Sequence, residues 1–124
     1  MYRITSSKAP AAIGPYSQGT SAARFVFVSG QLPVDPSTEG VVEGGIAAMT
    51  QRCIDNIEAV LAELDLTLAD VTKTTVFMTD LDRFDEMNGA YAERFHLPGP
   101  ARSCVEVKRL PRDVKVMIEA IACR

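Results

Sequence analysis

The sequence has no tryptophan, a single histidine and only three cysteines among its 124 residues. Cys53, Cys104 and Cys123 are widely spaced and form no C-x-x-C pair, which argues against a disulfide framework and suits a reducing compartment. With His96 as the only imidazole, a zinc site or a histidine-activated nucleophile has little support. We therefore expect no metal and no cofactor.

The chain also lacks an excess of positive charge and any long apolar run. Its 13 Lys and Arg residues are outnumbered by 16 Asp and Glu residues, so the formal net charge is −3. An acidic chain has no electrostatic footprint for a phosphate backbone, which makes nucleic-acid binding a poor expectation. No run approaches the roughly 20 apolar residues of a membrane helix, and Met1–Thr5 has no signal-peptide core. We expect a cytoplasmic protein.

Hydrophobic residues make up 47% of the chain, enough for one domain spanning residues 1–124. Alternating apolar residues predict strands, and apolar residues three and four apart predict helices. A turn-rich loop with prolines and glycines is predicted over residues 32–45. The predicted strands are 2–5, 20–23, 25–28, 71–78, 100–107 and 114–122, and the predicted helices are 46–65 and 84–95.

The resulting order is β-β-β-α-β-α-β-β, which defines an α+β fold. Right-handed crossover connections place both helices on one face of a mixed sheet. The other face then lacks a helical cover, and small domains usually hide such a face by forming oligomers.

The last predicted strand carries an isolated carboxylate. Glu119 lies on one face of this strand between Met117 and Ile121. It either pairs with Arg102 or Lys115, or holds and deprotonates a water molecule.

Arg102 stands near the start of the strand predicted over residues 100–107. Burying a guanidinium without a partner is costly, and a carboxylate held by two parallel hydrogen bonds is the best small partner for it. That carboxylate belongs either to a side chain of the protein or to a ligand. On strand and charge alone, a structural ion pair or a solvated edge arginine is the more common outcome.

Several separate motifs stand in order from one end of the chain to the other. They are Ala11–Gly19 (AAIGPYSQG), Ser29–Pro33 (SGQLP), Lys73–Phe77 (KTTVF), Pro100–Val107 (PARSCVEV), Leu110–Pro111 and Ile118–Ala122 (IEAIA). In this register they resemble the RidA (YjgF/YER057c/UK114) family. The Arg102-Ser103-Cys104 motif together with Glu119 resembles its deaminase-competent branch.

The resemblance implies a chorismate-mutase-like fold with six strands in the spatial order 1-2-3-6-4-5. It also implies a homotrimer with the sheets facing inward and three clefts between subunits. This agrees with the uncovered sheet face inferred from the order of the elements.

The resemblance further implies hydrolytic deamination of 2-aminoacrylate and related 2-imino acids, released by pyridoxal-phosphate enzymes, to 2-oxo acids and ammonia. By resemblance, Arg102 grips the substrate carboxylate and Glu119 activates the hydrolytic water. Cys104 acts mostly through its backbone groups.

Four further site residues follow from the same resemblance. Tyr16 forms a wall of the cleft from the neighbouring subunit, Ser29 and Gly30 line the pocket, and Asn88 supports it. One departure from the family concerns residues 95–100, which form a shorter segment than in typical members, so the substrate range is open.

The residue types suit this chemistry even when the resemblance to the family is set aside. A 2-imino acid is small, flat and anionic, so a fork-shaped cation is an obvious handle. Its C2 is electrophilic once the nitrogen is protonated, so no covalent nucleophile is required.

Two other functions stay open: a non-catalytic trimer that binds small carboxylates or proteins, and an endoribonuclease or translation inhibitor. The acidic charge argues against the last.

Overall fold

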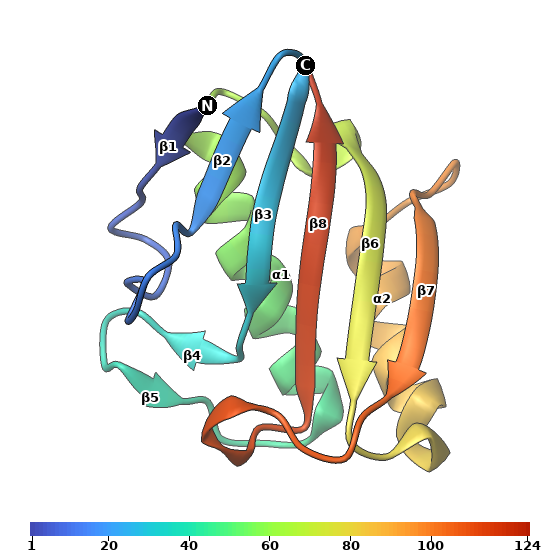
Figure 1. Ribbon diagram of the computed structural model, residues 1–124. Coiled ribbons are helices and arrows are strands. Elements are labelled where there is room, and N and C mark those ends of the chain that lie inside the picture. Colours follow the sequence, from blue (N-terminus) through green and yellow to red (C-terminus); the bar gives the residue numbers. More distant parts are fainter.

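A computed structural model describes residues 1–124. Six strands form one sheet, and both helices pack behind it in the view of Figure 1. The strands of this sheet are β1 (Tyr2–Ile4), β2 (Gly19–Ala22), β3 (Phe25–Gln31), β6 (Val71–Met78), β7 (Ala101–Glu106) and β8 (Val116–Cys123), and the helices are α1 (Ile46–Ala62) and α2 (Phe84–Arg94). The predicted α+β fold is confirmed.

The spatial order of the strands is β1-β2-β3-β8-β6-β7, which is the predicted order 1-2-3-6-4-5 in chain numbering. Strands β6 and β7 run parallel, and all other neighbours run antiparallel. The last strand, β8, inserts between β3 and β6, so strands β7 and β8 do not form a hairpin (Figure 1).

The hydrophobic core lies between the sheet and the two helices. It contains 20 buried residues, among them Ile54 and Ile57 of α1 and Met87 of α2. Alternate residues of β8, including Val116 and Ile118, point into this core, as the period of two predicts. Because one face of each element is buried in this core, the remaining side chains of the element lie on its opposite face.

Helix α1 ends at Ala62, three residues before the predicted end at residue 65. Its last turn tightens, and the amide of Leu66 donates to the carbonyl of Leu61 at 3.1 Å. Asp65 takes a left-handed conformation with φ of 57°, which stops the helix. At the start of β8, Arg112 and Asp113 are also left-handed, with φ of 59° and 55°. The strand therefore begins at Val116 instead of residue 114.

The segment predicted as a loop over residues 32–45 contains a second sheet of two short strands, β4 (Val34–Asp35) and β5 (Gly40–Val41). The carboxylate of Asp35 accepts hydrogen bonds from the amide and hydroxyl of Ser37, which tightens the turn between these strands. Asn56 of α1 donates to the carbonyls of Leu32 and Val34, both at 3.0 Å, and anchors the segment to the helix layer.

The face of the main sheet opposite the helices has no covering element. Phe25 and Phe27 of β3 and Val105 of β7 are exposed there to between 40% and 50%. The uncovered apolar face expected from the element order is therefore present. Neither helix is long and apolar enough to cross a membrane.

Candidate functional site

Arg102 lies on β7, the outer strand of the sheet, and its side chain points toward α2. Its Nη1 donates a hydrogen bond of 2.7 Å to Oδ1 of Asn88. The guanidinium carbon lies 4.7 Å from the ring centroid of Tyr91 and 5.5 Å from that of Phe84. The half-buried guanidinium is thus held by a neutral amide and two aromatic rings, and no carboxylate of the protomer forms an ion pair with it.

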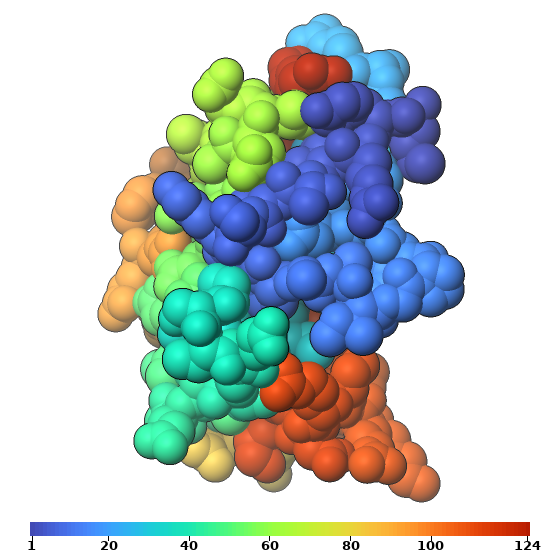
Figure 2. All heavy atoms as spheres, turned by 90° about the vertical axis from the view of Figure 1, so that its left-hand side faces the viewer, coloured from blue at the N-terminus to red at the C-terminus, as the bar shows by residue number.

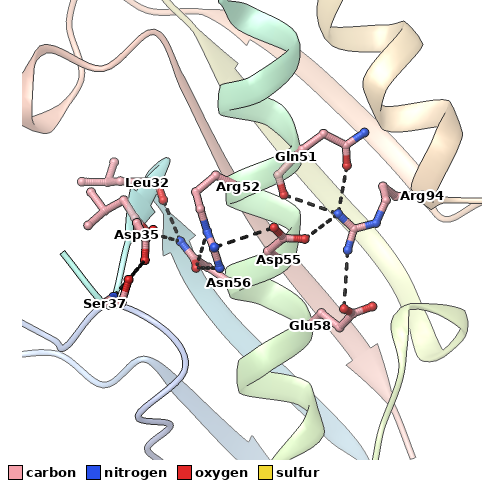
Figure 3. Close-up of polar contacts among 10 residues, drawn as sticks. Leu32, Asp35, Ser37, Gln51, Arg52, Asp55, Asn56, Glu58 and Arg94 are labelled. Carbon is pink, nitrogen blue, oxygen red and sulfur yellow. Dashed lines mark hydrogen bonds and ion pairs between the residues drawn. The ribbon is translucent and has the colours of Figure 1, made fainter. Parts of the chain in front are cut away.

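A second half-buried arginine, Arg94 at the end of α2, shows the opposite arrangement (Figure 3). It contacts Asp55 at 2.7 Å and Glu58 at 3.5 Å, and it also donates to the side chain of Gln51 at 2.9 Å. These contacts satisfy its charge and join α2 to α1. Arg94 is a structural arginine, whereas Arg102 donates to Asn88 and keeps most of its donors free of protein partners.

Cys104 follows Arg102 by two residues on the same face of β7 and packs against the hydrophobic core. Burial raises the pKa of its thiol above the ordinary value, and the positive charge of Arg102 only partly offsets this. The thiol is therefore protonated at neutral pH and is a poor nucleophile. Because β7 is an outer strand, part of its backbone faces away from β6 and can meet a ligand.

Tyr16 and Gly30 lie far from Arg102, around a hollow of about 740 Å³. Figure 2 shows this side of the molecule, where the N-terminal loop, the β4–β5 segment and the segment before β8 meet. Tyr16 is half exposed, and its hydroxyl accepts a hydrogen bond from the amide of Ile13 at 3.2 Å.

Ser29 and Gly30 lie on β3 where its register with β8 shifts. The hydroxyl of Ser29 donates to the carbonyl of Ser17 at 2.6 Å and ties β3 to the N-terminal loop. A Cβ atom at Gly30 would lie 2.8 Å from the sulfur of Met117, so glycine permits close packing of β3 on β8. The predicted pocket residues Tyr16, Ser29 and Gly30 therefore belong to one region.

Glu119 projects from β8 onto the uncovered face of the sheet. Thr75 of β6 stands opposite both Glu119 and Ser103, so these three side chains share that face. Arg102, one residue from Ser103, points to the helix face. Glu119 forms no ion pair, neither with Arg102 nor with Lys115.

Besides the region of Tyr16, Ser29 and Gly30, a single protomer keeps the other predicted site residues in two separate groups. Arg102, Asn88 and Cys104 lie between β7 and α2, whereas Glu119 is two strands away on the opposite face. Neighbouring strands are about 4.8 Å apart, so two spacings already exceed the reach of one small molecule. Within one chain, the structure therefore does not bring Arg102 and Glu119 together.

Tyr91 and Phe84 contact Arg102, although neither was predicted from the sequence as a site residue. Their spacing was the available signal, because positions 84, 88 and 91 follow one face of a helix. Only the packing of α2 against β7 shows that this face carries the guanidinium. No group of three or more His, Cys, Asp or Glu side chains lies together as a metal site would require.

The fold and the site together define a small α+β protein with a half-buried arginine that has no carboxylate partner. Comparison with known proteins identifies the family, because residues 6–124 match the family model described as Endoribonuclease L-PSP. The chain belongs to this family, which is the RidA (YjgF) family.

Individual relatives match over nearly their whole length. The chain is 50% identical over 119 residues to a RutC family protein of Pyrococcus abyssi, covering 96% of this chain and 94% of that one. It is 47% identical over 124 residues to the 2-iminobutanoate/2-iminopropanoate deaminase of Escherichia coli K12, covering 98% and 96%. The crystal structure of E. coli TdcF with bound serine superposes with a TM-score of 0.92 at 39% identity, covering 100% and 99%.

Proposed function

We propose that the protein hydrolyses reactive 2-imino acids, including those that arise from 2-aminoacrylate, to 2-oxo acids and ammonia. The observation that carries the proposal is the half-buried guanidinium of Arg102, which has aromatic and amide neighbours but no carboxylate partner. The deaminase name of the E. coli relative, at 47% identity, supports it.

The role that we propose for Arg102 is to bind the substrate carboxylate. The N–H donors of a guanidinium lie in one plane and match the two oxygens of a carboxylate. The low polarity of the Phe84 and Tyr91 rings strengthens this contact. Asn88 holds one donor, so the remaining donors present a defined orientation to the ligand. Backbone groups on the outer edge of β7 near Cys104 contact the imine nitrogen.

Glu119 supplies the proton transfers in this proposal. It accepts a proton from water as the new bond forms between the water oxygen and C2 of the protonated imine. It then returns this proton to the amine nitrogen of the carbinolamine. The C2–N bond breaks with its electron pair on nitrogen, ammonia leaves, and the hydroxyl proton passes to Glu119 as the carbonyl forms. Glu119 finally gives this proton to ammonia, which departs as ammonium. Water provides the oxygen of the 2-oxo acid, and neither a redox partner nor a covalent enzyme intermediate is needed.

Because one protomer keeps Arg102 and Glu119 on opposite faces, the proposal requires an oligomer. We propose a homotrimer in which the β7 edge of one copy lies against the uncovered face of the next. This arrangement buries Phe25 and Phe27 and brings Glu119 and Tyr16 of a neighbouring copy to Arg102. We treat residues 1–124 as one catalytic domain, and the three free thiols suit a reducing compartment such as the cytoplasm.

The test couples the protein to a threonine dehydratase acting on serine and follows pyruvate release. The wild-type protein accelerates release over the spontaneous rate, and Arg102→Ala abolishes the acceleration while remaining folded and trimeric. The matched control is Arg94→Ala, which loses a carboxylate-paired arginine and lowers the melting temperature without abolishing activity. No acceleration by the wild-type protein favours a non-catalytic binder of carboxylates, and an unfolded or monomeric Arg102→Ala makes Arg102 structural.

The description of the family model names a second candidate, an endoribonuclease. The net charge of −3 disfavours it, because RNA binding draws on clustered positive charge. Incubation of wild-type protein and Arg102→Ala with RNA separates the two functions. RNA cleavage that copurifies with the trimer and persists in Arg102→Ala would support a ribonuclease site distinct from the imine site.

A further inference from the structure

We propose that Tyr91 is a positioning residue that sets the orientation of the Arg102 guanidinium, an inference that rests on the proposed role of Arg102. The proposal starts from a register relationship. Thr74 of β6 stands directly opposite Arg102 of β7, so both side chains point to the helix face. Tyr91 of α2 contacts both of them.

The hydroxyl of Tyr91 is fixed by Thr74. The two hydroxyl oxygens are 2.7 Å apart, and the Thr74 side chain is fully buried. Tyr91 itself is 7% exposed and packs against Phe95, with ring centroids 4.6 Å apart. The ring therefore has little freedom, since one end is hydrogen-bonded to the neighbouring strand and the body is enclosed by the helix layer.

This fixed ring lies under the guanidinium. The guanidinium carbon is 4.7 Å from the centroid of Tyr91, a distance at which the negative face of the ring attracts the cation. Contact with a ring face uses none of the five N–H donors, because these lie in the guanidinium plane. A carboxylate in the same place would take the donors that the substrate needs.

Tyr91 and Asn88 complement one another. Asn88 occupies one donor of Nη1 in the plane of the guanidinium, and Tyr91 supports the face of that plane. Both come from α2, at positions three residues apart, so they act from one helical face. Together they restrict the translation and the rotation of the Arg102 head group before a substrate arrives, which lowers the ordering cost of binding.

The experiment uses the full-length trimer and compares Tyr91→Leu, Tyr91→Phe and Thr74→Val. Tyr91→Leu keeps an apolar side chain but removes the ring, and we expect KM for 2-iminobutanoate to rise roughly 3- to 30-fold. The dissociation constant of 2-oxobutanoate, measured by calorimetry, rises by the same factor. The value of kcat changes less than about twofold, because the carboxylate contact serves binding in ground state and transition state alike. Tyr91→Phe and Thr74→Val, which only untether the ring, give smaller shifts in the same direction.

Val26→Ala is the control, since it removes part of a fully buried core side chain on β3, three strands away from β7 and Arg102. It lowers the melting temperature but leaves KM within about twofold of wild type. A double-mutant cycle then combines Tyr91→Leu with Asn88→Ala. If both residues act through Arg102, the rise in KM is less than the product of the two single effects.

Two results would overturn the inference. One is an unchanged KM in a folded Tyr91→Leu trimer, and the other is a Val26→Ala variant whose KM rises as much as that of Tyr91→Leu. In either case, an inactive Arg102→Ala keeps the proposed function intact, because only the positioning role has failed. Should Tyr91→Leu not fold, an unchanged KM in both Tyr91→Phe and Thr74→Val would overturn the inference in the same way.

Discussion

Arg102 donates its 2.7 Å hydrogen bond to the neutral side chain of Asn88. The choice of an amide acceptor matters for a cation that we propose binds the substrate carboxylate. An amide oxygen orients the guanidinium without neutralising it, whereas a carboxylate at the same position forms an ion pair within the protein. Arg94 of α2, which contacts two carboxylates of α1, shows the other arrangement in the same protein.

Asn88→Asp should therefore give Arg102 an ion-pair partner within the protein. The new carboxylate lies within hydrogen-bond distance of Arg102 and competes with the substrate, so we expect KM to rise at least about tenfold. The melting temperature should stay the same or increase. Steady-state kinetics and thermal unfolding measure the two effects. Ala92→Asp, which places the same charge on an exposed position of α2, is the control and should leave KM unchanged.

Glu119→Gln should remove proton transfer but not substrate binding. We expect kcat to fall about 100-fold or more, and the dissociation constant of a 2-oxo acid to stay within about threefold of wild type. The matched control is Glu106→Gln on β7, whose carboxylate accepts a hydrogen bond from the amide of Leu81 on the helix side. It should cost some stability and little activity. Equal loss of kcat in both variants would show that Glu119 has no special role.

Cys104→Ala should retain activity, because burial raises the pKa of the thiol and keeps it protonated at neutral pH. We expect kcat within about threefold of wild type. The pH profile of kcat/KM between pH 6 and 9, the range that a thiolate at an ordinary pKa would affect, should keep its shape. A profile that loses its alkaline limb in Cys104→Ala would instead assign that limb to the thiol.

Gln18→Leu should loosen the N-terminal loop that carries Tyr16. The buried Gln18 amide donates to the carbonyls of Ser6, Ala9 and Pro10, and its oxygen accepts from the amide of Ser6. Leucine leaves these groups without partners, and we expect a loss of about 3 kcal/mol in the free energy of unfolding.

Limited proteolysis and activity measurements complete the test of the loop. Cleavage within residues 6–16 should accelerate, and KM should rise because Tyr16 is no longer held. Ser37→Ala, which removes a hydrogen bond in the β4–β5 turn, is a control that should affect neither property. A Gln18→Leu protein with wild-type stability would show that ordered water replaces the side chain.

Elements with a strong local signal were the easiest to predict. The β-branched run Val71–Met78 forms β6 with the predicted bounds, and the apolar stripe from Ile46 gives α1 its predicted start. The short strands β4 and β5 were missed because two residues each carry no usable period. The end of α1 was misplaced because Asp65 leaves the helix by a left-handed conformation that the sequence does not mark with glycine.

The sequence by itself determined which residues we propose to carry the chemistry, namely Arg102 and Glu119. It also determined which face of its own strand each occupies, since side chains alternate along a strand. Only the tertiary structure decided how those faces relate. The register that sets Thr75 opposite both Glu119 and Ser103 places Arg102 on the helix face and Glu119 on the uncovered face. That relation depends on pairing between strands distant in the chain, and such pairing is selected by burial of the whole core instead of by any local pattern.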